Sequence, residues 1–137
     1  MGTVSDVSLN PDDAGTLYAP DLINGVTPHL WIVLTDSDTD GNVAIVNVTD
    51  YKNHADQTTI LKVGDHPFIT KDSIVLYQDA RIVPRASLLN ALKSGKGCSQ
   101  HAQCPQALME RLKVGVFASD WTPNNVIDFC HKAWNRF

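Results

Sequence analysis

The amino-acid sequence predicts an α+β domain in which a small barrel or curled β-sheet comes first and helices follow. Short, β-branched apolar runs succeed one another closely between residues 29 and 83, which is typical of a small barrel or strongly curled sheet. Leucine-containing segments with helical spacing occupy the chain after Pro84. A chain of 137 residues also has the length of one domain, so we expect a single domain over residues 1–137.

The N-terminal residues 1–25 are expected to form an arm and a loop. They contain turn-forming clusters such as Asn10-Pro11-Asp12-Asp13 and show no sustained hydrophobic period. We expect residues 1–15 to be a loosely held arm and residues 16–26 to be a loop that leads into the sheet. The barrel core is then expected over residues 26–84 and the helical part over residues 85–137.

About five short strands are expected in the barrel core. They are Leu30–Thr35, Val43–Thr49, Thr59–Val63, Ile74–Tyr77 and Arg81–Val83, the last two being either a strand pair or one bent strand. The first run is almost entirely apolar, which predicts a strand covered on both faces. Asp40-Gly41 lies in a polar turn and predicts a hairpin between the first two strands. The loop from Asp50 to Thr58 is long and polar, and such loops often border a site.

Two or three helices are expected after Pro84. Ala86–Lys93 carries leucines at helical spacing and ends before Gly95-Lys96-Gly97, and Pro105–Lys113 has proline in its first turn. The last helix is expected to start at Thr122-Pro123, with threonine as the N-cap and an apolar stripe that reaches Trp134.

Charge and cysteine content limit the classes of function. The formal net charge of −4 does not indicate a nucleic-acid-binding protein, because neutralising phosphates usually requires a basic excess. No apolar run approaches the roughly 20 residues that span a bilayer, and the N-terminus does not resemble a secretory signal. Three cysteines are an odd number for a disulfide framework. We therefore expect a cytoplasmic protein that has no membrane partner.

Three segments of the strand region match a known arrangement in order and approximate spacing. They are Ile32-Val33-Leu34-Thr35, Val46-Asn47-Val48-Thr49 and the run from Ser73 to Val83. Together they resemble the MazF/PemK/Kid toxin superfamily over residues 22–92, about half the chain. Thr49 corresponds to a threonine that the family uses. The family's active-site arginine falls near the start of the first strand, where this chain has Thr27-Pro28-His29.

The resemblance implies a fold, an activity and partners. The fold would be a small SH3-like barrel, and the protein would be an endoribonuclease toxin of a type II toxin-antitoxin system. Such a toxin cleaves single-stranded RNA, needs no metal or other cofactor, works as a homodimer and is held inactive by an antitoxin protein. The segment from Cys98 to Phe137 is longer than a minimal member of the family requires.

Metal-independent RNA cleavage needs a base for the 2′-hydroxyl, an acid for the leaving 5′-oxygen and donors for the phosphate charge. Histidine suits both proton transfers because its unperturbed pKa is about 6.5. We predict that the catalytic residues are two histidines and two hydroxyl donors near strand ends, His29, His66, Thr49 and Ser73. We predict that cations and aromatic stacking platforms bind the substrate, namely Lys52, Lys71, Arg81, Tyr51 and Tyr77.

Each of these residues also has a purely structural interpretation. His29 could satisfy a backbone group, Gly64-Asp65-His66-Pro67 is a good turn, and Thr49 has a high intrinsic preference for strands. Ser73 could be bonded within its own turn. Cys98, His101 and Cys104, with Cys130 or His131, raise the possibility of zinc. The spacing Cys-x5-Cys is wider than that of structural zinc sites, so no metal is expected.

Two other functions remain open at the level of sequence. One is a non-catalytic SH3-like module that binds a protein or peptide and has lost the chemistry together with the family's arginine. The other is a toxin of the same fold that acts on DNA gyrase, because a fold does not determine a target. The acidic net charge of −4 favours an alternative that does not bind nucleic acid.

Overall fold

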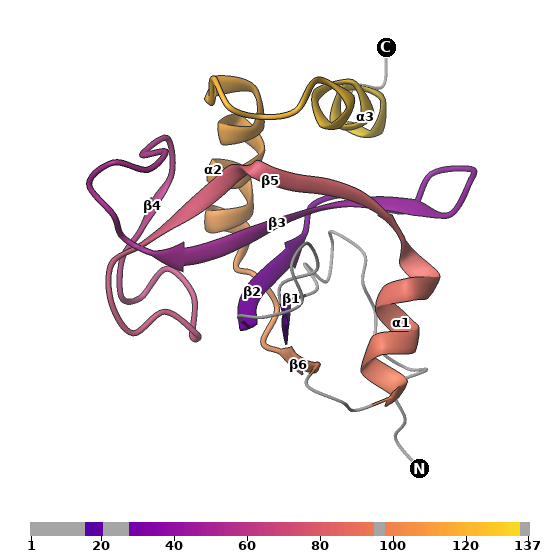
Figure 1. Cartoon of the computed structure of the whole chain (residues 1–137), viewed down its shortest axis with the longest axis horizontal. Helices are drawn as coiled ribbons and strands as arrows, with labels where there is room; N and C mark the ends of the chain where they lie inside the picture. The colour runs from indigo at the N-terminus through magenta and orange to yellow at the C-terminus, as the bar shows by residue number, and fades with distance from the viewer. Residues whose placement is uncertain (1–15, 21–27, 95–97, 135–137) are drawn as a thin grey trace.

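The computed structural model describes residues 16–20, 28–94 and 98–134, and it shows an α+β fold built on a curled antiparallel sheet (Figure 1). The strands are β1 (Thr16–Pro20), β2 (Pro28–Val33), β3 (Asn42–Asp50), β4 (Ile60–Leu61), β5 (Ser73–Pro84) and β6 (Ser99–His101). The helices are α1 (Arg85–Ser94), α2 (Gln106–Ala118) and α3 (Asn124–Trp134). The predicted fold class, a curled sheet with helices gathered toward the C-terminus, is confirmed.

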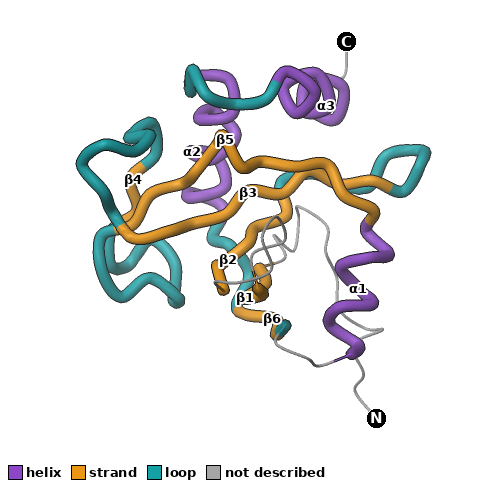
Figure 2. Tube along the Cα trace, viewed as in Figure 1, coloured by secondary structure: helices purple, strands orange, loops and turns teal. Residues whose placement is uncertain are grey.

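The strand order makes the sheet an open half-barrel. The order is β4-β5-β3-β2-β1-β6, and every neighbouring pair is antiparallel. In the described part of the chain, β4 and β6 each have one neighbour, so the curled sheet has two edges. The loops on either side of β4 gather at one end of the sheet, whereas α1 lies at the other end (Figure 2). No helix of the described residues is long and apolar enough to cross a membrane.

Strand β5 is one continuous, bent strand. Its partners on β3 are Leu76 for Asn47 and Arg81 for Ile45, so residues 77–80 stand opposite Val46 alone. Extra residues on one strand bend it and increase its local twist. The sequence allowed either a strand pair or one bent strand here. The structure shows one bent strand, because Ile74–Tyr77 and Arg81–Val83 both belong to β5.

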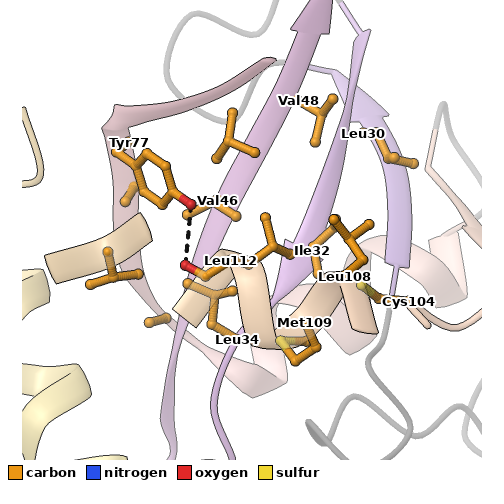
Figure 3. Close-up of a cluster of buried hydrophobic side chains, with 14 of the residues drawn as sticks. Leu30, Ile32, Leu34, Val46, Val48, Tyr77, Cys104, Leu108, Met109 and Leu112 are labelled. Atoms are coloured by element: carbon orange, nitrogen blue, oxygen red, sulfur yellow. Dashed lines mark hydrogen bonds between the residues drawn. The ribbon is translucent and has the colours of Figure 1, made fainter. Parts of the chain in front are cut away.

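The sheet is buried on both faces. Successive side chains of a strand point to opposite sides, so one strand contributes to two cores. Residues such as Leu30 and Ile32 enter a first core, which also contains Leu108 and Leu112 of α2 and Val126 of α3. Figure 3 shows part of this core. The alternate residues enter a second core on the other face, and this core comprises Trp31, Val33, Val43, Ile45, Leu88, Leu92 and Cys98. Burial on both faces explains the unbroken apolar run of β2.

A buried tyrosine connects the sheet to α2. The Tyr77 hydroxyl donates to the carbonyl of Leu112 at 3.1 Å (Figure 3). The Thr59 hydroxyl lies 2.7 Å from the Tyr77 oxygen and donates a hydrogen bond to it. Helix α2 has glycine at position 115, where an added Cβ would overlap the tyrosine hydroxyl. The prediction that Tyr77 stacks on RNA bases is wrong, because its ring is completely buried.

Two strands lie where the sequence predicted other structure. Residues 16–20 form β1 instead of a loop, and Ser99–His101 forms β6 inside the segment expected to be helical. Both gain backbone hydrogen bonds by pairing, β1 with β2 and β6 with β1. A strand that is recruited by backbone pairing needs no strong hydrophobic period of its own, so its sequence signal is weak. The predicted N-terminal arm, residues 1–15, lies outside the described residues.

The N-terminus of α3 also differs in detail from the prediction. The helix begins at Asn124, and the carbonyl of Pro123 accepts the amide protons of Val126 and Ile127. The Thr122 hydroxyl is buried without a hydrogen-bond partner, so it does not cap the helix. The chain therefore enters α3 one residue later than the threonine-proline pattern indicated.

We expect the substitution Gly115→Ala to lower the free energy of unfolding by about 1–3 kcal/mol, because the new methyl group would overpack against Tyr77. At a helix position with free space, glycine to alanine raises helix stability by roughly 1 kcal/mol. A loss of stability would therefore show that residue 115 is packed against Tyr77. Urea denaturation measures it. Val114→Ala is the matched control, since Val114 is 68% exposed on the same helix. Higher stability of the Gly115→Ala protein would contradict the packing described.

We also expect the protein to lose stability in alkali. Burial raises the pKa of Tyr77 from 10.0 to about 12, and it raises the pKa of Cys104 and Cys130 from 9.0 to about 12. The folded state therefore keeps protons that the unfolded chain releases. The stability is fully present below pH 9 and falls as the pH rises toward about 12, by roughly 1.4 kcal/mol per pH unit for each such proton.

Urea denaturation between pH 8 and pH 11 measures this loss. Tyr77→Phe is the control, because the substitution removes one of the three protons and must make the slope above pH 10 less steep. A free energy of unfolding that stays constant over this range would contradict the burial of these groups.

Candidate functional site

Four polar atoms are buried without hydrogen-bond partners on the second-core face of the sheet. They are Nδ1 of His29, Nε1 of Trp31, and both amide atoms of Asn47. Among the described residues, buried polar groups without partners are few, and native structures satisfy the great majority of such groups. Each one left alone costs roughly 1–3 kcal/mol. A cluster of them at the middle of a sheet therefore marks this face as the candidate functional site.

The strand register brings these groups together. Trp31 of β2 and Asn47 of β3 are directly opposite each other, so their side chains leave the sheet on the same face. His29 precedes Trp31 by two residues and Thr49 follows Asn47 by two, which places both on this face. Arg81 of β5 is opposite Ile45, so it leaves the sheet on the same face, two residues along β3 from Asn47 and four from Thr49. We call this group the central polar site, namely His29, Trp31, Asn47, Thr49 and Arg81.

The central polar site has a buried floor and a half-exposed rim. Trp31 and Asn47 have no exposed surface, whereas His29, Thr49 and Arg81 are half-buried. The charged member of the site is Arg81, and Asp79 lies two residues before it on β5. Indole, amide, hydroxyl and guanidinium groups all donate hydrogen bonds. This combination suits an anionic oxygen ligand such as a phosphate group.

His66 lies elsewhere and already has both ring nitrogens in hydrogen bonds. Its Nδ1 accepts the backbone amide proton of Phe68 at 2.9 Å, so Nε2 carries the ring proton and donates to the carbonyl of Ala102 at 3.1 Å. The residue is 1% exposed, and the neighbouring Phe68 and Ile69 pack against the first core. Neither of these two hydrogen bonds involves His29, and they give His66 a structural role that joins a turn to the segment before α2.

Three predicted residues surround a small cavity at the end of β3. Thr49, Lys71 and Ser73 contribute to the lining of a space of about 80 Å³. Ligand pockets usually measure roughly 300–1,000 Å³, so this space is too small for a nucleotide. The Ser73 hydroxyl donates to the carbonyl of Lys71 at 2.9 Å, and the Lys71 ammonium pairs with Asp50 at 3.0 Å. These contacts hold the strand end and the following loop together.

Tyr51 and Lys52 begin the polar loop that follows β3. Tyr51 is 38% exposed and Lys52 is exposed, so both side chains are available to a ligand. Thr49 is two residues before Tyr51 on the same segment. The loop is positioned by a backbone hydrogen bond from Tyr51 to the carbonyl of Asp72 at 3.1 Å. These residues can extend the rim of the central polar site but do not form its floor.

The cysteines lie in separate parts of the protein. Cys98 packs in the second core, whereas Cys104 and Cys130 pack in the first core on the other face of the sheet. Within residues 16–20, 28–94 and 98–134, no three histidine, cysteine or acidic side chains are grouped so that they could hold a metal ion. Burial raises the pKa of all three thiols, so they behave as small apolar side chains.

Sequence reasoning missed the floor of the central polar site. Trp31 and Asn47 are in strands that were predicted correctly, but neither was proposed as a site residue. A signal was present, because Asn47 interrupts the apolar run Ala44-Ile45-Val46-Asn47-Val48 with an amide. A polar residue at the centre of a strand buried on both faces conflicts with its surroundings, and such conflicts concentrate at functional positions.

Comparison with known proteins adds no relative to this arrangement. No known family model, curated protein or solved structure matches the chain.

Proposed function

We propose that the protein is an endoribonuclease toxin of the MazF/PemK/Kid type that cleaves single-stranded RNA without a metal ion. The observation that carries this proposal is the placement of His29 and Thr49 on one face of neighbouring strands, beside unpaired buried donors. In the MazF/PemK/Kid superfamily that the chain resembles, the positions of His29 and Thr49 correspond to the active-site arginine and threonine. Arg81 on β5 adds a positive charge to the same face.

The proposed reaction transfers the phosphate from the 5′-oxygen of one nucleotide to the 2′-oxygen of its neighbour. A bond forms between the 2′-oxygen and phosphorus, and the bond from phosphorus to the 5′-oxygen breaks. Arg81 and Thr49 would bind the non-bridging oxygens, which carry more charge in the transition state. His29, protonated on both ring nitrogens, would give its outward ring proton to the leaving 5′-oxygen and become neutral, while a water molecule takes the proton of the 2′-hydroxyl.

This mechanism needs one histidine where the sequence predicted two. Both nitrogens of His66 are engaged by the backbone, so the proposal assigns it no proton transfer. Tyr77 and Ser73 are likewise left out, because their hydroxyl groups already bond within the fold. Tyr51 and Lys52, on the exposed loop after β3, remain proposed contacts to the RNA. The homodimer and the antitoxin remain part of the proposal through the resemblance alone.

A second candidate function is a non-catalytic module that binds a protein. It is favoured by an exposed apolar surface at the end of α2 and after it, where Val114 is 68%, Phe117 43% and Trp121 62% exposed. Exposed aromatic residues of this kind are enriched in protein interfaces. The net charge of −4 also agrees better with a protein partner than with RNA.

The test is cleavage of a long single-stranded RNA by the purified protein in the presence of EDTA. We expect His29→Ala to lower the cleavage rate by roughly 10²–10⁴-fold, because the substitution removes the proposed acid. Circular dichroism would establish that the variant is folded. An RNA that stays intact with folded wild-type protein would overturn the ribonuclease proposal and favour the protein-binding module.

His66→Ala is the matched histidine variant, and the expected result is the opposite one. The substitution leaves the amide of Phe68 and the carbonyl of Ala102 without their partner, so stability should fall by about 1–3 kcal/mol. The cleavage rate at a temperature where the variant is folded should equal that of the wild type. Loss of cleavage by folded His66→Ala protein would return His66 to the catalytic group.

A further inference from the structure

The polar loop that follows β3 contains a buried carboxylate. Among residues 51–58, all of which the structure describes, Asp56 alone is buried, with 8% of its surface exposed. Aspartate is seldom buried without partners, because a charged group that leaves water must find hydrogen bonds inside the protein. The partners of Asp56 therefore show to which part of the fold the loop is attached.

Asp56 attaches the loop to the C-terminal end of α2. Its Oδ1 accepts both the amide proton of Thr58, at 2.9 Å, and the hydroxyl proton of the same residue. Its Oδ2 accepts the hydroxyl proton of Ser119, the C-cap residue of α2, which lies 63 residues further along the chain. The Ser119 oxygen in turn accepts the amide proton of Trp121 at 3.1 Å. All three partners donate to Asp56, which suits a carboxylate because its oxygens only accept.

The same loop carries Tyr51 and Lys52, the proposed contacts to the RNA. Ala55 immediately precedes Asp56, and its amide donates to the carbonyl of Lys52 at 3.3 Å. At the other end, the amide of Tyr51 donates to the carbonyl of Asp72 at 3.1 Å. The exposed segment that begins at Tyr51 is therefore attached at both of its ends, and Asp56 is the attachment to α2.

We propose that Asp56 is a positioning residue that fixes this loop so that Tyr51 and Lys52 are held ready to bind the substrate. The inference rests on the function proposed above, because RNA is the ligand of these two side chains. Asp56 itself does not touch the RNA, since its carboxylate is buried and bonded to Thr58 and Ser119. A loop that is ordered before the ligand arrives loses less conformational entropy on binding. Loss of the carboxylate should therefore weaken RNA binding and leave the chemical step intact.

Amide hydrogen exchange in the free protein tests the attachment. We expect Asp56→Ala to speed the exchange of the Ala55 and Thr58 amides by roughly tenfold, while the amides of β2 and β3 keep the wild-type rate. Asp120→Ala is the matched control, because it removes the same charge from an exposed position next to Ser119. Unchanged exchange in the loop would overturn the proposal. Equal acceleration in the loop and the strands would also overturn it, since Asp56 would then stabilise the whole fold.

Ser119→Ala keeps the experiment decisive if Asp56→Ala does not fold. This substitution removes the α2 side of the attachment and leaves the hydrogen bonds between Asp56 and Thr58 in place. The Ala55 amide should again exchange faster than in the wild type. An unchanged rate would show that the contact with α2 does not fix the loop.

Asp56→Asn separates the hydrogen bonds from the volume of the side chain. The amide oxygen can still accept from Thr58, and the amide nitrogen can donate to the oxygen of Ser119. We expect this variant to keep the slow exchange of the Ala55 amide. Exchange as fast as in Asp56→Ala would contradict the role of these hydrogen bonds.

The kinetics of RNA cleavage test the role of the loop in binding. Asp56→Ala should raise KM about tenfold and change kcat by less than about twofold, because the lost interactions are made equally in the ground state and the transition state. In a protein that already carries Tyr51→Ala and Lys52→Ala, the same exchange should raise KM no further, since the loop then has no binding side chains to position. An equal rise of KM in both backgrounds would overturn the positioning role.

The exchange rates are measured without RNA, so this inference and the ribonuclease proposal can fail separately. Faster loop exchange in Asp56→Ala, combined with RNA that the wild type leaves intact, would retain Asp56 as the residue that fixes the loop and reject the ribonuclease. Cleavage of RNA combined with unchanged loop exchange would do the reverse.

Discussion

The hydroxyl group of Tyr77 joins three parts of the chain, and the first core is arranged around it. It bonds to Thr59 before β4 and to Leu112 in α2, while the tyrosine itself belongs to the bent part of β5. An unpaired hydroxyl in this core would be costly, so the loop and the helix must approach the strand closely. Gly115 permits that approach because it has no side chain. This buried polar contact thus helps to fix the position of α2 over the sheet, together with the apolar packing of the first core and the ion pair of Arg111 with Asp65.

Most of the sheet could be predicted because its central strands carry strong local signals. β2 and β3 are mainly apolar runs separated by a turn at Asp40-Gly41, with Asn47 as the polar interruption of β3, and the structure agrees with both strands. β1 and β6 could not be predicted in the same way, because they are edge and near-edge strands held by backbone pairing with distant segments. The hydrophobic periodicity of a short segment does not show which distant strand its backbone will pair with.

The candidate site was partly predictable for a related reason. His29 and His66 have similar local surroundings in the sequence, since both lie next to an apolar strand and beside a proline. Their roles differ in the structure because Ala102, 36 residues away from His66, supplies the second partner of that ring. His29 has no such partner for Nδ1. Contacts between remote segments decide which histidine is available for chemistry, and no local pattern contains them.

The strands at the two edges of the sheet are also its shortest. β4 spans Ile60–Leu61 and pairs only with Ser73 and Ile74, so most of the 12-residue β5 has no strand on that side in the described structure. Long, flat edges invite another chain to add a strand and are a common origin of aggregation, whereas bends and bulges make an edge harder to extend. The bend of β5 opposite Val46 thus interrupts the part of the edge that β4 leaves uncovered, and a second copy or a partner protein would have to follow that bend in order to continue the sheet.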